Sequence, residues 1–101
     1  MVKISIQEQD DKMVAVFDGR LDTPSTPEAG KALDPLLQCD DKDVIFDCTR
    51  LDYISSSGLR LFLDILKHSK AHEHHVFIKN ISAPIREAFV LTGFINLFEY
   101  I

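Results

Sequence analysis

The stretch Asp47-Cys-Thr-Arg-Leu-Asp-Tyr-Ile-Ser-Ser-Ser-Gly-Leu-Arg-Leu-Phe-Leu63 joins a predicted strand to a predicted helix. Just before it, the apolar run Val44-Ile-Phe46 is typical of a strand that is buried on both faces. Its later apolar residues recur at a spacing of three and four, which predicts an amphipathic helix. The serines Ser55, Ser56 and Ser57 lie where the two elements meet.

The chemistry of this junction suits a negative group. Serine hydroxyls at a helix start accept hydrogen bonds from backbone N–H groups that have no partner in the helix. Gly58 carries no side chain, so another molecule can approach the turn closely. A helix N-terminus also stabilises an anion placed on it. The sequence therefore predicts an exposed hydroxyl at a position where a phosphate is tolerated.

The helix after the serines is more apolar than a surface helix needs to be. Its apolar residues cover an arc of roughly 200 degrees, whereas an arc of about 100 degrees is enough to contact a core. The part expected to face the core comprises Leu59, Phe62, Leu63 and Leu66. Leu61 and Ile65 form the excess edge, next to the polar Arg60 and Asp64. Either a neighbouring helix covers this edge, or it is a partner-docking edge beside the serines.

The composition of the chain limits the number of domains and the kinds of partner that it can have. The chain has 101 residues, which suits one domain over 1–101, and its hydrophobic fraction of 46% predicts a globular protein. The net charge is −5 and no Lys/Arg-rich run is present, which argues against nucleic acid as a partner. No stretch resembles a leader or a membrane span, so we expect a cytoplasmic protein without membrane insertion.

The first half of the chain predicts a hairpin and a helix. Apolar residues alternate over Val2–Gln7 and concentrate over Met13–Phe17, and the loop between these strands looks too long for a two-residue turn. Ser25, followed three residues later by Glu28, fits a capping box that opens a helix. A proline at position 35 should kink or end that helix near residue 34.

The second half predicts two further strand and helix pairs. The serine helix should end between Lys70 and Glu73, and a strand should follow over His75–Lys79. Ser82 would cap a third helix that Gly93 stops, with the next apolar residue folding back. A short last strand completes an α/β sandwich: a mixed four- to five-stranded sheet with helices mainly on one face.

A serine at a strand-to-helix turn also raises the possibility of a hydrolase. The nucleophile elbow of that class needs Gly-x-Ser-x-Gly, but Ile54 and Ser55 precede Ser56 here. All four histidines lie between His68 and His75, about 18 Å along the helix from the serines. We therefore expect no catalytic Ser–His pair and no enzymatic activity.

Histidines and acids raise two further possibilities. His68 and His72 are four residues apart and can share a metal, with His74 or His75 as a third ligand. No carboxylate or cysteine is clearly placed to complete the set, and the helix C-terminal dipole also favours histidines there. We expect no metal site and no cofactor. We expect Asp22 and Asp47 each to end a strand, so both should lie at the serine end of the sheet.

Five motifs, in order and at suitable spacing, resemble those of the STAS domain family, and in particular single-domain bacterial anti-sigma factor antagonists. The resemblance runs from about Val2 to Tyr100. The motifs are Gly19-Arg-Leu-Asp22, Val44-Ile-Phe-Asp-Cys48, Ile54-Ser-Ser-Ser-Gly-Leu59, Ile81-Ser-Ala-Pro-Ile-Arg-Glu-Ala-Phe89 and Thr92-Gly-Phe94.

The resemblance assigns roles to particular residues. Family members are phosphorylated on the first hydroxyl after an aspartate, which corresponds to Ser56 here, with Ser57 as second choice. Ser55 replaces the family's aspartate, and Asp22 matches a family acid that lies close to the phosphorylated residue. The expected partner-binding residues are Asp22, Thr23, Ser55, Ser56, Ser57, Gly58, Arg60, Leu61, Asp64 and Ile65.

The resemblance also implies a function. The unmodified protein would bind an anti-sigma factor that is a serine kinase and so release a sigma factor, regulating transcription. Phosphorylation would end binding, and a serine phosphatase would reset the switch. The alternative is a STAS subunit of a lipid or solute ABC transporter that docks on its ATPase subunit. Many members continue into another helix where this chain stops, so we also expect a weak homodimer.

Overall fold

The computed structural model describes residues 2–101 and begins with two strands, β1 (Val2–Gln9) and β2 (Lys12–Leu21). Apolar residues alternate in β1 and form a continuous run in β2. The strands pair antiparallel through a two-residue turn at Asp10 and Asp11, whose φ angles are 49° and 66°. The expectation of a longer loop was wrong, because aspartate tolerates the positive φ that such a tight hairpin turn requires.

A short 3-10 turn, η1 (Thr23–Ser25), leads into α1 (Thr26–Leu37). The expected early end near Asp34 was wrong, because α1 continues through Pro35 to Leu37. The alternative, a kink at this point, stays a prediction. Pro35 lies in the last turn, so the only helical bond it removes is one to the carbonyl of the exposed residue Lys31.

The second half forms two strand and helix pairs and a closing strand. These elements are β3 (Asp43–Ile54), α2 (Ser56–Ala71), β4 (Val76–Lys79), α3 (Ala83–Thr92), the 3-10 turn η2 (Phe94–Leu97) and β5 (Glu99–Tyr100). The predicted end of α2 is confirmed. β3 is 12 residues long and passes through Asp47, so the expectation that Asp47 ends a strand beside the serines was wrong.

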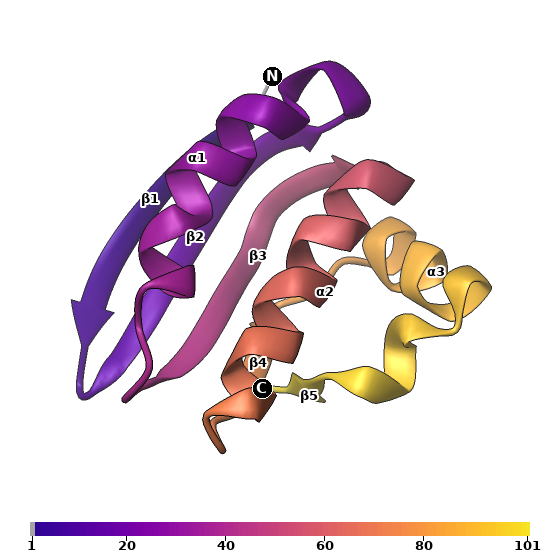
Figure 1. The fold of residues 1–101 in the computed structure, drawn as a ribbon. Coiled ribbons are helices and arrows are strands. Elements are labelled where there is room, and N and C mark those ends of the chain that lie inside the picture. The colour runs from indigo at the N-terminus through magenta and orange to yellow at the C-terminus, as the bar shows by residue number, and fades with distance from the viewer. Residues whose placement is uncertain (1) are drawn as a thin grey trace.

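The sheet has the strand order β1-β2-β3-β4-β5, and every pair after the first is parallel. Each parallel connection steps to the next strand in the same direction, and right-handed crossovers then place every helix on the same face. Figure 1 shows α1 and α2 side by side in front of the sheet, with α3 beyond α2. The predicted α/β fold with a mixed sheet is confirmed.

Residues that line the inner face of the sheet form one core with the helices. Its centre is aromatic and contains Phe17, Phe46, Phe62, Phe89 and Phe98. Cys48, on the same face, is fully buried, and this burial raises the pKa of its thiol to about 12. Among residues 2–101, none of the helices combines the length and apolar character of a membrane span.

Two helical glycines give a matched test of this packing. A Cβ at Gly58 would lie 2.7 Å from Leu21 Cγ, whereas one at Gly30 would lie 3.7 Å from Leu61 Cδ2. Gly58→Ala should therefore lower the free energy of unfolding by about 1–3 kcal/mol through overpacking. Gly30→Ala should raise it by about 0.4–1 kcal/mol, because alanine fits without strain and restricts the unfolded chain. Urea denaturation measures both, and equal effects would contradict the packing described here.

Candidate functional site

The start of α2 is tied to the sheet by Ser55. Its Oγ accepts a hydrogen bond from the Gly58 N–H at 3.1 Å, which makes Ser55 the N-cap residue. Its own N–H donates to the carbonyl oxygen of Leu21 at 2.8 Å. The predicted cap is confirmed, and Ser55 is only 7% exposed. The first serine of the triplet therefore has a structural task.

The next two serines face outward to different extents. Ser56 is exposed and is the first residue of α2, while Ser57 is half-buried. Within residues 2–101, neither hydroxyl has a hydrogen-bond partner. Ser56 thus presents the accessible hydroxyl of the triplet, at the end of the helix where a negative charge is stabilised.

A ridge of three exposed side chains runs along α2 from this hydroxyl. Ser56, Arg60 and Asp64 follow one another at intervals of four residues, and we call them the serine ridge. A hollow of about 460 Å³ lies on the α3 side of the ridge, and its other lining residues are Leu59, Leu63, Lys67, Thr92 and Phe94. A hollow of about 260 Å³ lies on the α1 side, where Thr26, Ser57 and Leu61 complete the lining. The ridge with its two hollows is the candidate site.

The predicted apolar edge of α2 needs correction. Ile65 is 1% exposed and belongs to the core, so its expected place on an exposed docking edge was wrong. The buried face is centred on Phe62, which puts the half-buried Leu61 and Leu63 at its two edges. Periodicity gave the width of the apolar arc correctly, but its centre lies nearer Ile65 than expected.

The open approach expected at Gly58 was also wrong. Gly58 is buried, and its missing side chain leaves room for Leu21 and Ile54 rather than for another molecule. Ser55, Gly58 and Ile65 therefore offer little surface to a partner. The predicted residues that keep exposed surface are Asp22, Thr23, Ser56, Ser57, Arg60, Leu61 and Asp64.

The sequence analysis did not identify the residues that line the α3-side hollow opposite the serine ridge. Leu63, Thr92 and Phe94 line the α3-side hollow with Lys67. The signal for two of them was in the chain, because Gly93, with φ of 78°, ends α3 and turns Phe94 back toward α2. Recognising that Phe94 returns to α2 required knowledge of how the two helices pack.

Asp22 uses its carboxylate to hold η1. The Ser25 hydroxyl donates to Asp22 Oδ1 at 2.7 Å, and the Ser25 N–H donates to the same oxygen at 3.1 Å. The box expected between Ser25 and Glu28 is wrong, because Ser25 instead caps reciprocally with Asp22. Asp22 lines a separate hollow with Pro24 and Val2. It follows Leu21, whose carbonyl accepts from the Ser55 N–H, so it lies at the serine end of the sheet as expected.

These contacts also set the charge of Asp22. The hydrogen bond from the Ser25 hydroxyl is the largest cause that lowers the pKa of Asp22 below its ordinary value of 3.8. The ionised carboxylate therefore stabilises the turn above that value, and this contribution is lost as the pH falls through the lowered pKa. Its proposed influence on a modified serine stays a prediction.

The hydrolase alternative finds no support in the geometry. No histidine is among the described residues that line the two hollows beside Ser56. His68 lies in the last turn of α2, at the far end from the serines.

Comparison with models of known protein families identifies the family to which this chain belongs. A model of the STAS domain matches residues 3–100. The chain belongs to the STAS domain family. The anti-sigma-B factor antagonist of Staphylococcus aureus is 28% identical over 96 residues, which cover 95% of this chain and 89% of the relative.

Solved structures of anti-sigma factor antagonists share the fold of this STAS domain. An anti-sigma factor antagonist from Mycobacterium paratuberculosis has a TM-score of 0.88 at 15% identity, over 99% of this chain and 85% of that one. Unphosphorylated SpoIIAA has a TM-score of 0.78 at 20% identity, over 100% and 88%. Phosphorylated SpoIIAA from Bacillus has a TM-score of 0.72 at 18% identity, over 100% and 91%.

The different surroundings of the serines give a test. Ser55→Ala should lower the free energy of unfolding by about 1 kcal/mol, because the Gly58 N–H loses its acceptor. Ser56→Ala is the matched control, and it should change stability by less than about 0.5 kcal/mol because the side chain is exposed. Urea denaturation measures both. A larger loss for Ser56→Ala than for Ser55→Ala would contradict the assignment of the cap.

Proposed function

We propose that this STAS domain is an anti-sigma factor antagonist whose binding is controlled by phosphorylation of Ser56. Unmodified, it binds an anti-sigma factor serine kinase through the serine ridge and its two hollows, releases a sigma factor and so regulates transcription. The observation that carries the proposal is the position of Ser56, an exposed hydroxyl at a helix start between two hollows. The name of the Staphylococcus aureus relative supports the same role.

The choice of Ser56 over its neighbours rests on access. A kinase must reach the hydroxyl oxygen, and Ser55 is buried with its oxygen already occupied as the helix cap. Ser57 is half-buried on the α1 side and remains the second choice. SpoIIAA, a fold relative, has been solved in both unphosphorylated and phosphorylated forms.

A phosphate on Ser56 should leave the fold intact. It adds about −1.5 to −2 charges at neutral pH. At a helix N-terminus this charge gains about 0.3–1 kcal/mol, and up to about 2 kcal/mol when partly buried. Arg60 lies one turn further along the same ridge and can pair with the phosphate. The modification therefore acts on the surface rather than on folding.

The same phosphate should have a large effect on binding. Across a desolvated interface, an unpaired or like-charged group costs several kcal/mol, and each 1.4 kcal/mol is a tenfold change in affinity. Binding should fall about a hundredfold while the stability of the domain hardly changes. Because the phosphate changes the binding affinity but not the stability of the fold, removing it restores binding.

The chain itself needs no cofactor for this role and is not an enzyme. The kinase binds the ATP, and a separate serine phosphatase removes the phosphate. We expect this cycle to take place in the cytoplasm, where these partner enzymes act. The alternative, a transporter subunit docking on an ATPase, would use the same surface, but the named relatives favour the anti-sigma antagonist role.

The test uses purified protein and an anti-sigma factor kinase from the same genome. Ser56→Ala should bind the kinase as the parent does but accept no phosphate in the presence of ATP. Ser56→Asp should bind about tenfold to a hundredfold more weakly, because it carries part of the phosphate charge. Calorimetry and phosphate incorporation measure the two effects.

Ser5→Ala is the matched control, because it removes an exposed serine hydroxyl outside the ridge and its two hollows, and it should bind and be phosphorylated normally. The proposal fails if Ser56→Ala is phosphorylated like the parent, or if Ser56→Asp keeps full affinity. Capture of a transporter ATPase together with failure to bind any anti-sigma factor kinase would favour the alternative.

A further inference from the structure

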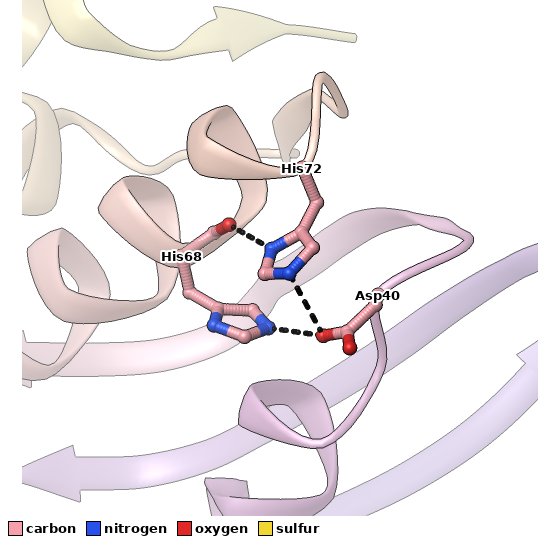
Figure 2. A group of neighbouring side chains, drawn as sticks. All are labelled: Asp40, His68 and His72. Carbon is pink, nitrogen blue, oxygen red and sulfur yellow. Dashed lines mark hydrogen bonds and ion pairs between the residues drawn. The ribbon is translucent and has the colours of Figure 1, made fainter.

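We propose that Asp40, His68 and His72 form a binding site for a divalent transition-metal ion such as Zn²⁺. Figure 2 shows the three side chains converging, with both imidazoles from the end of α2 and the carboxylate from the α1–β3 connection. Their ligand atoms all lie within 4.8 Å of one another. The site is at the opposite end of α2 from Ser56 and is independent of the function proposed above.

The distances suit a metal ion without large movement. Asp40 Oδ1 lies 2.9 Å from His68 Nε2 and 3.5 Å from His72 Nε2. Zinc binds nitrogen and oxygen at about 2.0–2.2 Å, so two of its ligands lie roughly 3.0–3.4 Å apart in octahedral or tetrahedral geometry. The two observed separations bracket that range. Because Asp40 and His72 are exposed, water can complete the coordination.

The orientation of His72 points to a cation. Its Nδ1 lies 2.9 Å from the carbonyl oxygen of His68, and a carbonyl only accepts, so Nδ1 must carry a hydrogen. In a neutral ring, Nε2 then directs a lone pair at the Asp40 carboxylate, which is also an acceptor. A metal ion between these two atoms would bind both of them. A ring N–H bound to a backbone carbonyl is also how proteins orient histidine ligands of metals.

The ligand set indicates the class of metal. Two imidazole nitrogens and one carboxylate oxygen suit Zn²⁺, Ni²⁺ or Cu²⁺, whereas Ca²⁺ and Mg²⁺ prefer oxygen ligands. The third ligand considered from the sequence, His74 or His75, is not part of the group. His74 pairs with Asp43 at 3.0 Å and His75 with Glu99 at 2.7 Å.

A metal here would join two segments that are separated along the chain by β3 and most of α2. It would hold the last turn of α2 against the connection that carries Asp40, just before β3 begins. Because the unfolded chain does not keep these three side chains together, binding would stabilise the folded state.

The experiment titrates the whole chain with ZnCl₂ at pH 7.5 in a buffer that does not bind metals. Calorimetry should show saturable binding of one equivalent to the parent. His72→Gln and Asp40→Asn should each weaken binding at least about tenfold. His75→Gln is the matched control, because it removes an exposed histidine outside the group, and it should bind as the parent does.

Thermal melting gives a second readout. Zinc should raise the Tm of the parent and of His75→Gln, and it should leave the Tm of His72→Gln nearly unchanged. The proposal is overturned if the parent shows no saturable binding, in which case the group is an ion-pair cluster only. It is also overturned if His72→Gln and Asp40→Asn bind zinc as tightly as the parent, or if His75→Gln loses binding as they do.

Discussion

The packing of Phe62 against four other phenylalanine rings holds the domain together. Its ring centroid lies 4.3 Å from that of Phe46 and 5.0 Å from that of Phe17, both on the sheet. It lies 6.1 Å from Phe89 in α3 and 6.5 Å from Phe98 before β5. One fully buried side chain therefore contacts the sheet, the third helix and the closing segment. Such rings bury large apolar areas, and aromatic pairs add about 0.5–1.5 kcal/mol each.

This contact fixes the rotation of α2 and, with it, the proposed switch. Once Phe62 faces the sheet, helical geometry turns Ser56, Arg60 and Asp64 outward. The sheet order adds a second constraint, because it places all three helices on one face and gives the ridge a helix on each side. In the proposed switch, a partner would contact this surface, and a phosphate on Ser56 would change its charge.

Much of the fold followed from the sequence because strong local signals agreed with one another. The order of strands and helices, the cap at Ser55 and the stop at Gly93 were all predicted and are present. The errors arose where long-range packing decides. Periodicity alone could not place the centre of the apolar face of α2, so Ile65 was put at its edge. Asp40 was missed as a neighbour of His68 because 28 residues separate them and only the fold brings them together.

The central claim is that Ser55 is committed to the helix cap, which leaves Ser56 to carry the signal. The most direct measurement is mass-spectrometric localisation of phosphate after the parent protein is incubated with ATP and its anti-sigma factor kinase. We expect one phosphate, on Ser56. Phosphate on Ser55 or Ser57 in place of Ser56, or only outside the serine triplet, would contradict it.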